Sequence, residues 1–230
     1  MPPSALAPVA PAGHEGAGGL GMVGRIIEGE GCLAEGAAWP ASREARVGQA
    51  LALAGPLAPR RRPDGFAALF DAIVSQQVSV AAADAIWARL EAAGYTDPAL
   101  LAGADDDSLR ACGLSRQKAR YGRALAAAGI DYPALRGAPT EQVIATLVAV
   151  PGIGVWTAEI YAMFSLGRAD VFAPGDLALQ EAARRLFDLP ERPKERPFRA
   201  MAEGWSPWRG VAARLLWAYY RVSTEREGVR

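Results

Sequence analysis

Leu147-Val-Ala-Val-Pro-Gly-Ile-Gly-Val-Trp156 is the stretch that decides the fold, and Val171-Phe-Ala-Pro-Gly-Asp176 follows it in the chain. Pro151, Gly152 and Gly154 cannot continue a helix, because proline lacks an amide hydrogen and glycine is a poor helix former. Apolar residues at helical spacing lie on both sides of this interruption. The sequence therefore predicts two helices joined by a tight turn.

The turn between these helices is a candidate anion site. At the start of the second helix the backbone amides of Gly152, Gly154 and Val155 have no partner within the helix, and glycine lets a phosphate approach them closely. Such a site needs no charged side chain. The alternative is an ordinary pair of packed helices, with a glycine that ends the first of them.

Helical periodicity also dominates the chain on either side of the turn. From Asp64 onward, apolar residues recur at intervals of three and four, which is typical of helices that bury one face. Gly94 is expected to stop the helix that begins near Val80. The residues expected to cap helix N-termini are Asp97, Asp105, Ser115, Thr140 and Asp176.

The N-terminal quarter of the chain is less informative. Residues 1–20 are rich in Ala, Pro and Gly and contain the single histidine, His14, so we expect a flexible tail. Met22-Val-Gly-Arg-Ile-Ile27 could form a short strand, but no alternating run follows that would build a sheet. We therefore expect three parts: the tail at 1–20, a poorly determined segment at 21–63 that can pack on the C-terminal lobe, and a helical core at 64–230 with its hairpin at 148–156.

Composition indicates a globular protein of the cytoplasm. Of the 230 residues 51% are apolar, which is enough for a substantial core without disulfides. Cys32 and Cys112 are too far apart in sequence to suggest a metal cluster or a disulfide framework. The chain has neither a long apolar run nor the features of a signal peptide, so we expect no membrane association.

The charges are unevenly divided along the chain. The formal net charge is zero, yet residues 1–114 carry 8 Lys/Arg against 13 Asp/Glu, and residues 115–230 carry 17 against 12. Zero net charge argues against a nucleic-acid partner, whereas the positive second half leaves one open. Arginine outnumbers lysine by 23 to 2, which a GC-rich genome explains as readily as phosphate binding does.

Several motifs resemble those of one protein family. Val150-Pro-Gly-Ile-Gly-Val-Trp-Thr-Ala158 together with Phe172-Ala-Pro-Gly-Asp176 resembles the helix-hairpin-helix DNA glycosylase superfamily, and within it the DNA-3-methyladenine glycosylase II type. Further motifs agree in order and spacing: Ala72-Ile-Val-Ser-Gln-Gln-Val-Ser-Val80, Gly113-Leu-Ser-Arg-Gln-Lys-Ala119, and Trp205-Ser-Pro-Trp-Arg209 leading to Leu215-Leu-Trp217. Together these motifs span residues 64–222.

The resemblance implies an all-α fold of two lobes with the active-site cleft between them. The N-terminal α/β domain of full-length relatives would be absent here, or reduced to the segment around Ile26 and Ile27. The resemblance places the catalytic carboxylate at Asp176. Cleavage of an N-glycosidic bond passes through a positively charged sugar, which a nearby anion stabilises. Asp176 can also cap the helix that follows it. The two roles are compatible, because a cap position would hold the catalytic carboxylate rigidly.

Position 156 indicates the type of reaction. Members of the superfamily that also nick the strand have a lysine there, which forms a Schiff base with the sugar. This chain has Trp156, and its only lysines are Lys118 and Lys194. We therefore expect a monofunctional glycosylase, with water as the nucleophile, that leaves an abasic site.

The resemblance also implies a pocket for a flipped base. Trp156 and Trp217 match family positions that line it, and electron-rich aromatic rings bind the positively charged face of an alkylated purine. At 160, where relatives have a tyrosine, this chain has Ile160, with Tyr161 next to it. We expect all four residues in the pocket, although tryptophan at helical spacing is also typical of a core.

Other parts of the family's DNA site map onto this chain. Gln77 corresponds to the residue that fills the gap left by the flipped base. The hairpin of the superfamily often binds Na⁺ or K⁺ through backbone carbonyls, which here would be those of Val148, Val150 and Ile153. No other cofactor is expected, and an iron–sulfur cluster is excluded because the four closely spaced cysteines of another branch are missing.

The leading hypothesis is a base-excision enzyme that releases alkylated purines of the 3-methyladenine and 7-methylguanine type from double-stranded DNA. We expect it to act as a monomer in a bacterial cytoplasm, on the nucleoid. One alternative is a glycosylase for uncharged deaminated or etheno bases, for which the sequence shows no clear hydrogen-bond donors. The other is a non-catalytic DNA-binding module, against which Asp176 argues, because a carboxylate weakens phosphate binding.

Overall fold

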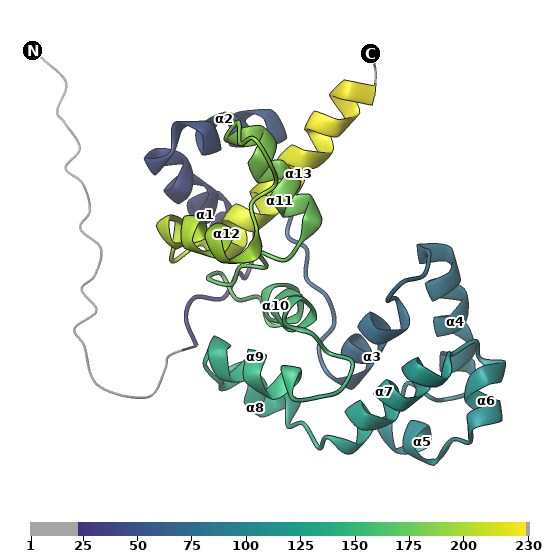
Figure 1. Cartoon of the computed structure of the whole chain (residues 1–230). Coiled ribbons are helices and arrows are strands. Elements are labelled where there is room, and N and C mark those ends of the chain that lie inside the picture. Colours follow the sequence, from purple (N-terminus) through teal and green to yellow (C-terminus); the bar gives the residue numbers. More distant parts are fainter. Residues whose placement is uncertain (1–22, 229–230) are drawn as a thin grey trace, which may run out of the picture.

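The structure is a computed structural model, and it describes residues 23–228. The predictions for the tail, for His14 and for Met22 lie outside these residues. Within the described part there is no strand, and the only β-type pairing is an isolated bridge between Ile26 and Arg168. The prediction of an all-α fold is confirmed. The described helices form two lobes with α10 between them (Figure 1).

The first lobe holds the helices that follow Asp64. Its members are α3 (Phe66–Val74), α4 (Val80–Ala92), α5 (Pro98–Gly103), α6 (Asp106–Ala111) and α7 (Arg116–Ala127). α7 lies at its centre and contacts α3, α5 and α6. Gly122 permits this packing, because a Cβ there would lie 2.6 Å from the ring of Phe70. The predicted caps Asp97, Asp105 and Ser115 each accept a hydrogen bond from a backbone amide of the first turn.

The middle of the molecule contains α8 (Tyr132–Gly137), α9 (Thr140–Val148) and α10 (Val155–Phe164). α9 and α10 are the two predicted helices around the glycine turn, and they pack against each other. Thr140 was expected to cap α9, but it is the first helical residue. The cap position is Pro139, which offers no side-chain acceptor.

The second lobe combines the beginning and the end of the described chain. It consists of α1 (Glu30–Arg43), α2 (Ala45–Ala54), α11 (Leu177–Leu186), α12 (Glu195–Ala202), η1 (Glu203–Trp205) and α13 (Arg209–Gly228). α13 packs against α1, α2 and α11. Gly36 brings α1 close to the start of α13, since a Cβ there would lie 2.5 Å from Trp208. Residues 21–63, for which the sequence suggested at most a strand, therefore contribute two helices.

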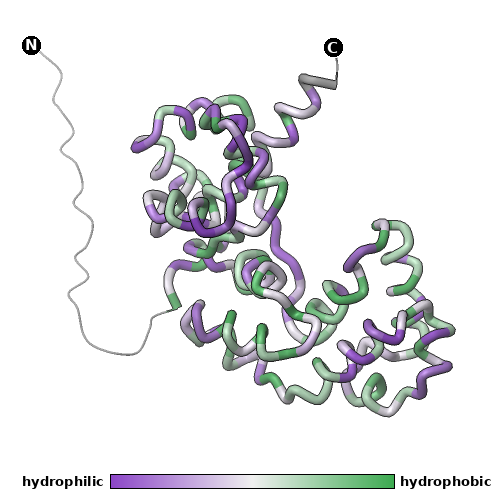
Figure 2. Tube along the Cα trace, in the orientation of Figure 1, coloured by the Kyte–Doolittle hydropathy of each residue, from purple (hydrophilic) through white to green (hydrophobic). Residues whose placement is uncertain are grey.

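The core runs through both lobes, and the buried Arg168 connects distant parts of it. Arg168 is 1% exposed, and its guanidinium donates to the carbonyls of Leu135, Arg136, Ala138 and Val23. A cation at the C-terminal end of a helix is favourable. The Arg168 guanidinium therefore stabilises the end of α8 and connects α8 to the N-terminal segment. The tube view shows that the stretch joining α2 to α3 contains a strongly hydrophilic part, which includes Arg60, Arg61 and Arg62 (Figure 2). This hydrophilic stretch passes between the lobes.

Candidate active site

Asp176 lies where a tight turn enters α11. Its backbone amide donates to the carbonyl of Ala173 at 3.1 Å, and its side chain accepts from the amide of Leu179 at 3.0 Å. The buried amide of Gln180 donates to the carbonyl of Pro174 at 2.8 Å and braces the turn from the other side. Asp176 is therefore an N-cap whose carboxylate is held at the N-terminus of α11.

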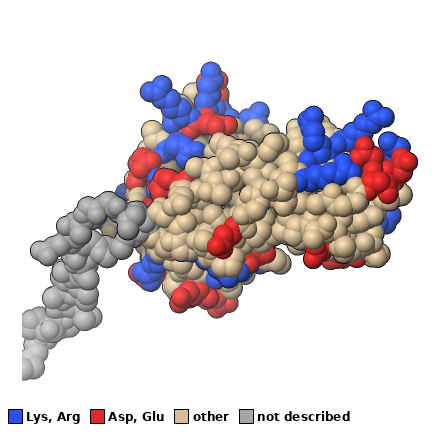
Figure 3. All heavy atoms as spheres, turned by 90° about the horizontal axis from the view of Figure 1, so that it is seen from below, with Lys and Arg blue, Asp and Glu red and all other residues tan. Residues whose placement is uncertain are grey.

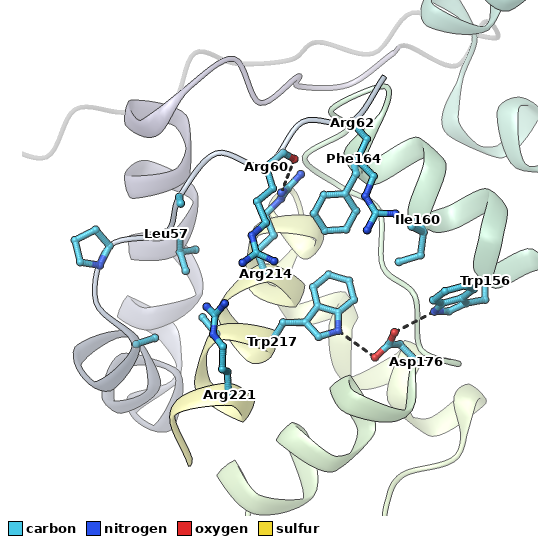
Figure 4. A pocket seen from close by; sticks show the side chains of 14 residues that line it. Leu57, Arg60, Arg62, Trp156, Ile160, Phe164, Asp176, Arg214, Trp217 and Arg221 are labelled. Carbon is cyan, nitrogen blue, oxygen red and sulfur yellow. Dashed lines mark hydrogen bonds between the residues drawn. The ribbon is translucent and has the colours of Figure 1, made fainter. Parts of the chain in front are cut away.

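Two tryptophans from different helices meet at this carboxylate. Trp156 Nε1 on α10 donates to Asp176 Oδ2 at 3.1 Å, and Trp217 Nε1 on α13 donates to Asp176 Oδ1 at 3.0 Å (Figure 4). With the Leu179 amide, the carboxylate accepts from three donors. The sequence suggested that these residues share a pocket, but not that both indoles bind the carboxylate.

The three residues line a cavity of about 460 Å³ between α10 and the second lobe. Phe164 and Trp217 form its aromatic side, with ring centroids 5.6 Å apart. The hydrophilic stretch between α2 and α3 closes the cavity on the side away from Asp176 (Figure 4). The lining residues are Ala54, Pro56, Leu57, Ala58, Arg60, Arg62, Trp156, Ile160, Phe164, Asp176, Arg214, Trp217, Ala218 and Arg221.

Of the two neighbouring α10 residues expected in the pocket, the structure places one at the cavity and the other in the core. Ile160 lines the cavity. Tyr161 does not, because its ring is 4% exposed and belongs to the core, where its hydroxyl accepts from the amide of Gly65 at 2.9 Å. Trp156, Ile160 and Phe164 lie at intervals of four on one face of α10, and Tyr161 lies a third of a turn away from them.

Sequence reasoning missed the arginines of the cavity. Arg60 and Arg62 come from the hydrophilic stretch, and Arg214 and Arg221 come from α13. The last two could have been found, since they stand three and four residues from Trp217 and so share its helix face. Burial, together with the charges of Arg60 and Arg61, lowers the pKa of Arg214 to about 10.

The glycine turn has the geometry of an anion site. Gly152 has a φ of +94°, and a Cβ there would overlap the ring of Tyr121, so only glycine fits. Among the described residues, the amides of Gly152, Gly154 and Val155 have no protein acceptor, and α10 starts without a side-chain cap. Gly154 and Val155 are exposed. The predicted phosphate donors therefore face solvent.

The carbonyls predicted to hold a cation lie on the same turn. Val148 ends α9, and the carbonyl of Val150 accepts from the amide of Ile153 at 3.1 Å. The part of the chain that the structure describes has no cluster of three His, Cys, Asp or Glu side chains suited to a metal ion. A cation at the hairpin would thus depend on backbone oxygens.

Gln77 projects from the loop between α3 and α4. It is exposed, and its φ of +56° is uncommon for a residue other than glycine. Two contacts brace this loop: Gln76 Nε2 donates to the carbonyl of Gly152 at 3.0 Å, and Lys118 Nζ donates to the carbonyl of Val74 at 2.7 Å. The loop that carries Gln77 is thereby tied to the glycine turn.

The charged surface is consistent with a polyanionic partner. In Figure 3, Lys and Arg side chains project in two groups, one on each lobe, with a largely uncharged surface between them. No helix of the described residues is long and apolar enough to cross a membrane.

Comparison with known proteins agrees with this geometry. Residues 70–208 match the model of the family described as "HhH-GPD superfamily base excision DNA repair protein". DNA-3-methyladenine glycosylase 1 of Schizosaccharomyces pombe is 30% identical over 77% of this chain and 83% of its own. DNA-3-methyladenine glycosylase 2 of Escherichia coli is 31% identical over 74% of this chain and 64% of its own. One curated relative, from Bacillus subtilis, is matched over only 46% of its length.

Solved structures show the same arrangement. The crystal structure of a DNA-3-methyladenine glycosidase from Bacillus halodurans superimposes with a TM-score of 0.76 at 33% identity, covering 83% of this chain and 91% of that one. The Schizosaccharomyces pombe enzyme in complex with abasic DNA superimposes with a TM-score of 0.69 at 28% identity, covering 80% and 95%.

Proposed function

Because this chain belongs to the HhH-GPD superfamily of base excision DNA repair proteins, we propose that it is a monofunctional DNA glycosylase. It releases alkylated purines, of the 3-methyladenine and 7-methylguanine type, from duplex DNA. The relatives named above are 3-methyladenine glycosylases. The observation that carries the proposal is one carboxylate, Asp176, held by two indoles at the wall of an aromatic cavity.

Binding begins at the DNA backbone. The unpaired amides of Gly152, Gly154 and Val155 receive a phosphate at the N-terminus of α10. Gln77 enters the space left by the flipped nucleotide, because it is exposed on a loop that Gln76 ties to the turn. The basic groups on the two lobes contact the backbone on either side (Figure 3).

Cleavage takes place beside Asp176. The flipped base stacks on the aromatic side of the cavity, where a cationic ring is attracted to Trp156 and Trp217. As the glycosidic bond breaks, positive charge develops on the sugar, and the fixed carboxylate stabilises it. Water then attacks the sugar. Because position 156 is a tryptophan and not a lysine, it provides no amine that could form a Schiff base with the sugar.

Two further properties complete the proposal. The carbonyls of Val148, Val150 and Ile153 would hold Na⁺ or K⁺ between the hairpin and a DNA phosphate. Replacing both ions with tetramethylammonium at constant ionic strength is then expected to weaken DNA binding. Unchanged DNA binding would contradict the proposed cation site. The protein would act as a monomer in the cytoplasm, on nucleoid DNA.

The test uses duplex DNA treated with a methylating agent. Purified protein is expected to release free 3-methyladenine and 7-methylguanine, detected by chromatography. The DNA strand should stay intact until alkali is added, because the product is an abasic site. Binding without release would support a non-catalytic module, and strand breaks before alkali would contradict the monofunctional mechanism.

A further inference from the structure

Hydrogen-bond donors dominate the polar lining of the cavity. Four of the lining side chains are arginines, which donate and never accept. The two tryptophans are also donors, and the remaining lining residues other than Asp176 are apolar. Asp176 is thus the only lining side chain that can accept a hydrogen bond.

Three donors already occupy most of the roughly four acceptor sites of the Asp176 carboxylate. Its oxygens accept from Trp156, Trp217 and the amide of Leu179. Asp176 also stands at the end of the cavity where the sugar is cleaved under the proposed function. A base in the cavity therefore meets donors along its far edge, because the only side-chain acceptor of the lining is Asp176 at the sugar end.

Arg62 is the arginine best placed to meet that edge. Its backbone amide donates to the carbonyl of Phe164 at 3.1 Å, which fixes its position relative to α10. Its guanidinium lies 5.5 Å from the centroid of the Phe164 ring. In Figure 4 the side chain reaches into the space between Ile160 and Trp217. No carboxylate of the described residues forms an ion pair with it.

Arg214 is a second arginine of the cavity lining that contacts Phe164. It is 7% exposed, lies 4.2 Å from the centroid of Phe164, and donates to the carbonyls of Arg60 and Met163. The like charges of Arg60 and Arg221 line the same cavity. A carbonyl oxygen on a bound base would give these guanidinium groups a hydrogen-bond acceptor.

We propose that Arg62 makes this pocket select, among alkylated purines, those with an oxygen at ring position 6 over those with an amino group there. This specificity rests on the proposed function. With the glycosidic bond at Asp176, position 6 lies on the opposite side of the purine and faces the arginines. A guanine-type edge offers O6 as an acceptor to the guanidinium fork, together with N7 where N7 is not alkylated, whereas an adenine-type edge sets its amino donors against arginine donors.

The matched pair of substrates is 3-methylguanine and 3-methyladenine, which carry the methyl group at the same ring atom and occur together in methylated DNA. Single-turnover release of both bases from one duplex preparation is compared for the wild type, Arg62→Met and Arg61→Met. Methionine keeps an unbranched side chain without donors. Arg61 is the control, because it loses the same charge from the same stretch but does not line the cavity.

The expected result is that Arg62→Met lowers the rate ratio of 3-methylguanine to 3-methyladenine by about tenfold, which corresponds to ~1.4 kcal/mol. Arg61→Met should leave the ratio unchanged. The two glycosidic bonds differ in intrinsic stability, but this difference cancels because the ratio of each variant is compared with that of the wild type.

Two outcomes would contradict the proposed selection by Arg62 but leave the proposed glycosylase function intact. If the wild type releases both bases and the ratio is the same in Arg62→Met, Arg62 does not sense position 6. If Arg62→Met weakens binding of all duplexes equally and reduces its salt dependence, Arg62 contacts a phosphate instead. Failure of the wild type to release either base would contradict the proposed function itself.

Discussion

At the residue scale, Asp176 depends on partners that are distant in sequence. Its cap role comes from the local turn, but the two indoles that reach it belong to α10 and α13. A carboxylate that only capped α11 would need neither tryptophan. The convergence of both donors indicates that the fold fixes the direction of this carboxylate as well as its position.

The glycine turn allows a test with two neighbouring residues. Gly152→Ala should lower the melting temperature and weaken DNA binding, because φ is +94° and the new Cβ would overlap Tyr121. Gly154→Ala is the control for folding, since its φ is −88° and nothing lies within 4 Å of the added carbon. Thermal melting and DNA titration measure the two effects. Equal melting temperatures of the two variants would contradict the strain argument.

The sequence predicted residues whose roles are local. Gly152, Gly154 and the cap Asp176 belong to short patterns whose backbone consequences are direct. Tyr161 is the exception, because it lies in the core and not at the cavity as expected. The spacing of Trp156, Ile160 and Phe164 would have corrected this, since residues four apart share a face.

At the element scale, the loop from α3 to α4 depends on one lysine. Lys118→Met removes the Nζ that donates to the carbonyl of Val74 at 2.7 Å. Hydrogen bonds from charged groups contribute about 1.5–3 kcal/mol, so the loop around Gln77 should exchange its amide hydrogens about tenfold faster or more. Hydrogen exchange of residues 75–78 measures this. Lys194→Met, which changes the other lysine, should leave the exchange of these amides unaltered. An equal effect of both variants would contradict the role of Lys118 in this loop.

α11 carries a pH-dependent contribution to stability. Hydrogen bonds from Arg184 and Arg185 lower the pKa of Glu181 from 4.5 to about 2. A depressed folded pKa means that the carboxylate stabilises the fold above pH 4.5 and loses this effect as the pH falls toward 2. Glu181→Gln should therefore melt at a lower temperature than the wild type at neutral pH, and the difference should shrink on acidification below pH 4.5. Melting curves of both proteins along a pH series test this, and a constant difference would contradict it.

Elements with weak sequence patterns could not be predicted. α1 contains Gly31, Gly36 and Pro40, which usually interrupt helices. It forms nevertheless, because packing of α1 and α2 against α13 outweighs local preference. Burial against a distant helix is not visible in the segment itself.

At the scale of the whole molecule, Arg168 connects parts that are far apart in sequence. Its guanidinium donates to carbonyls of residues 23, 135, 136 and 138. Arg168→Leu removes the donor shared by these carbonyls, most of which are at least partly buried, and the free energy of unfolding should fall by about 2–4 kcal/mol. Urea denaturation measures the loss. Arg196→Leu, at an exposed arginine, should change it by less than about 0.5 kcal/mol. A similar small change for Arg168→Leu would refute its structural role.

The two-lobed arrangement followed from the family's motifs, but the character of the cavity did not. The motifs predicted a carboxylate and aromatic rings, and the structure places these together. The arginines of the cavity come from the stretch between α2 and α3 and from α13, and only the three-dimensional fold brings them beside Phe164. The sequence could therefore not assign Arg60 and Arg62 to the cavity, whereas Arg214 and Arg221 share the helix face of Trp217.

The central claim is that Asp176 performs the cleavage, and one comparison tests it most directly. Single-turnover release of 3-methyladenine and 7-methylguanine is measured for the wild type, Asp176→Asn and Asp131→Asn. Asp131 is a matched control, because it caps α8 as Asp176 caps α11, away from the cavity, and asparagine is an equally good cap. We predict that Asp176→Asn binds DNA and stays folded but releases base at least about a hundredfold more slowly, while Asp131→Asn keeps the wild-type rate. Wild-type release by Asp176→Asn would contradict the account.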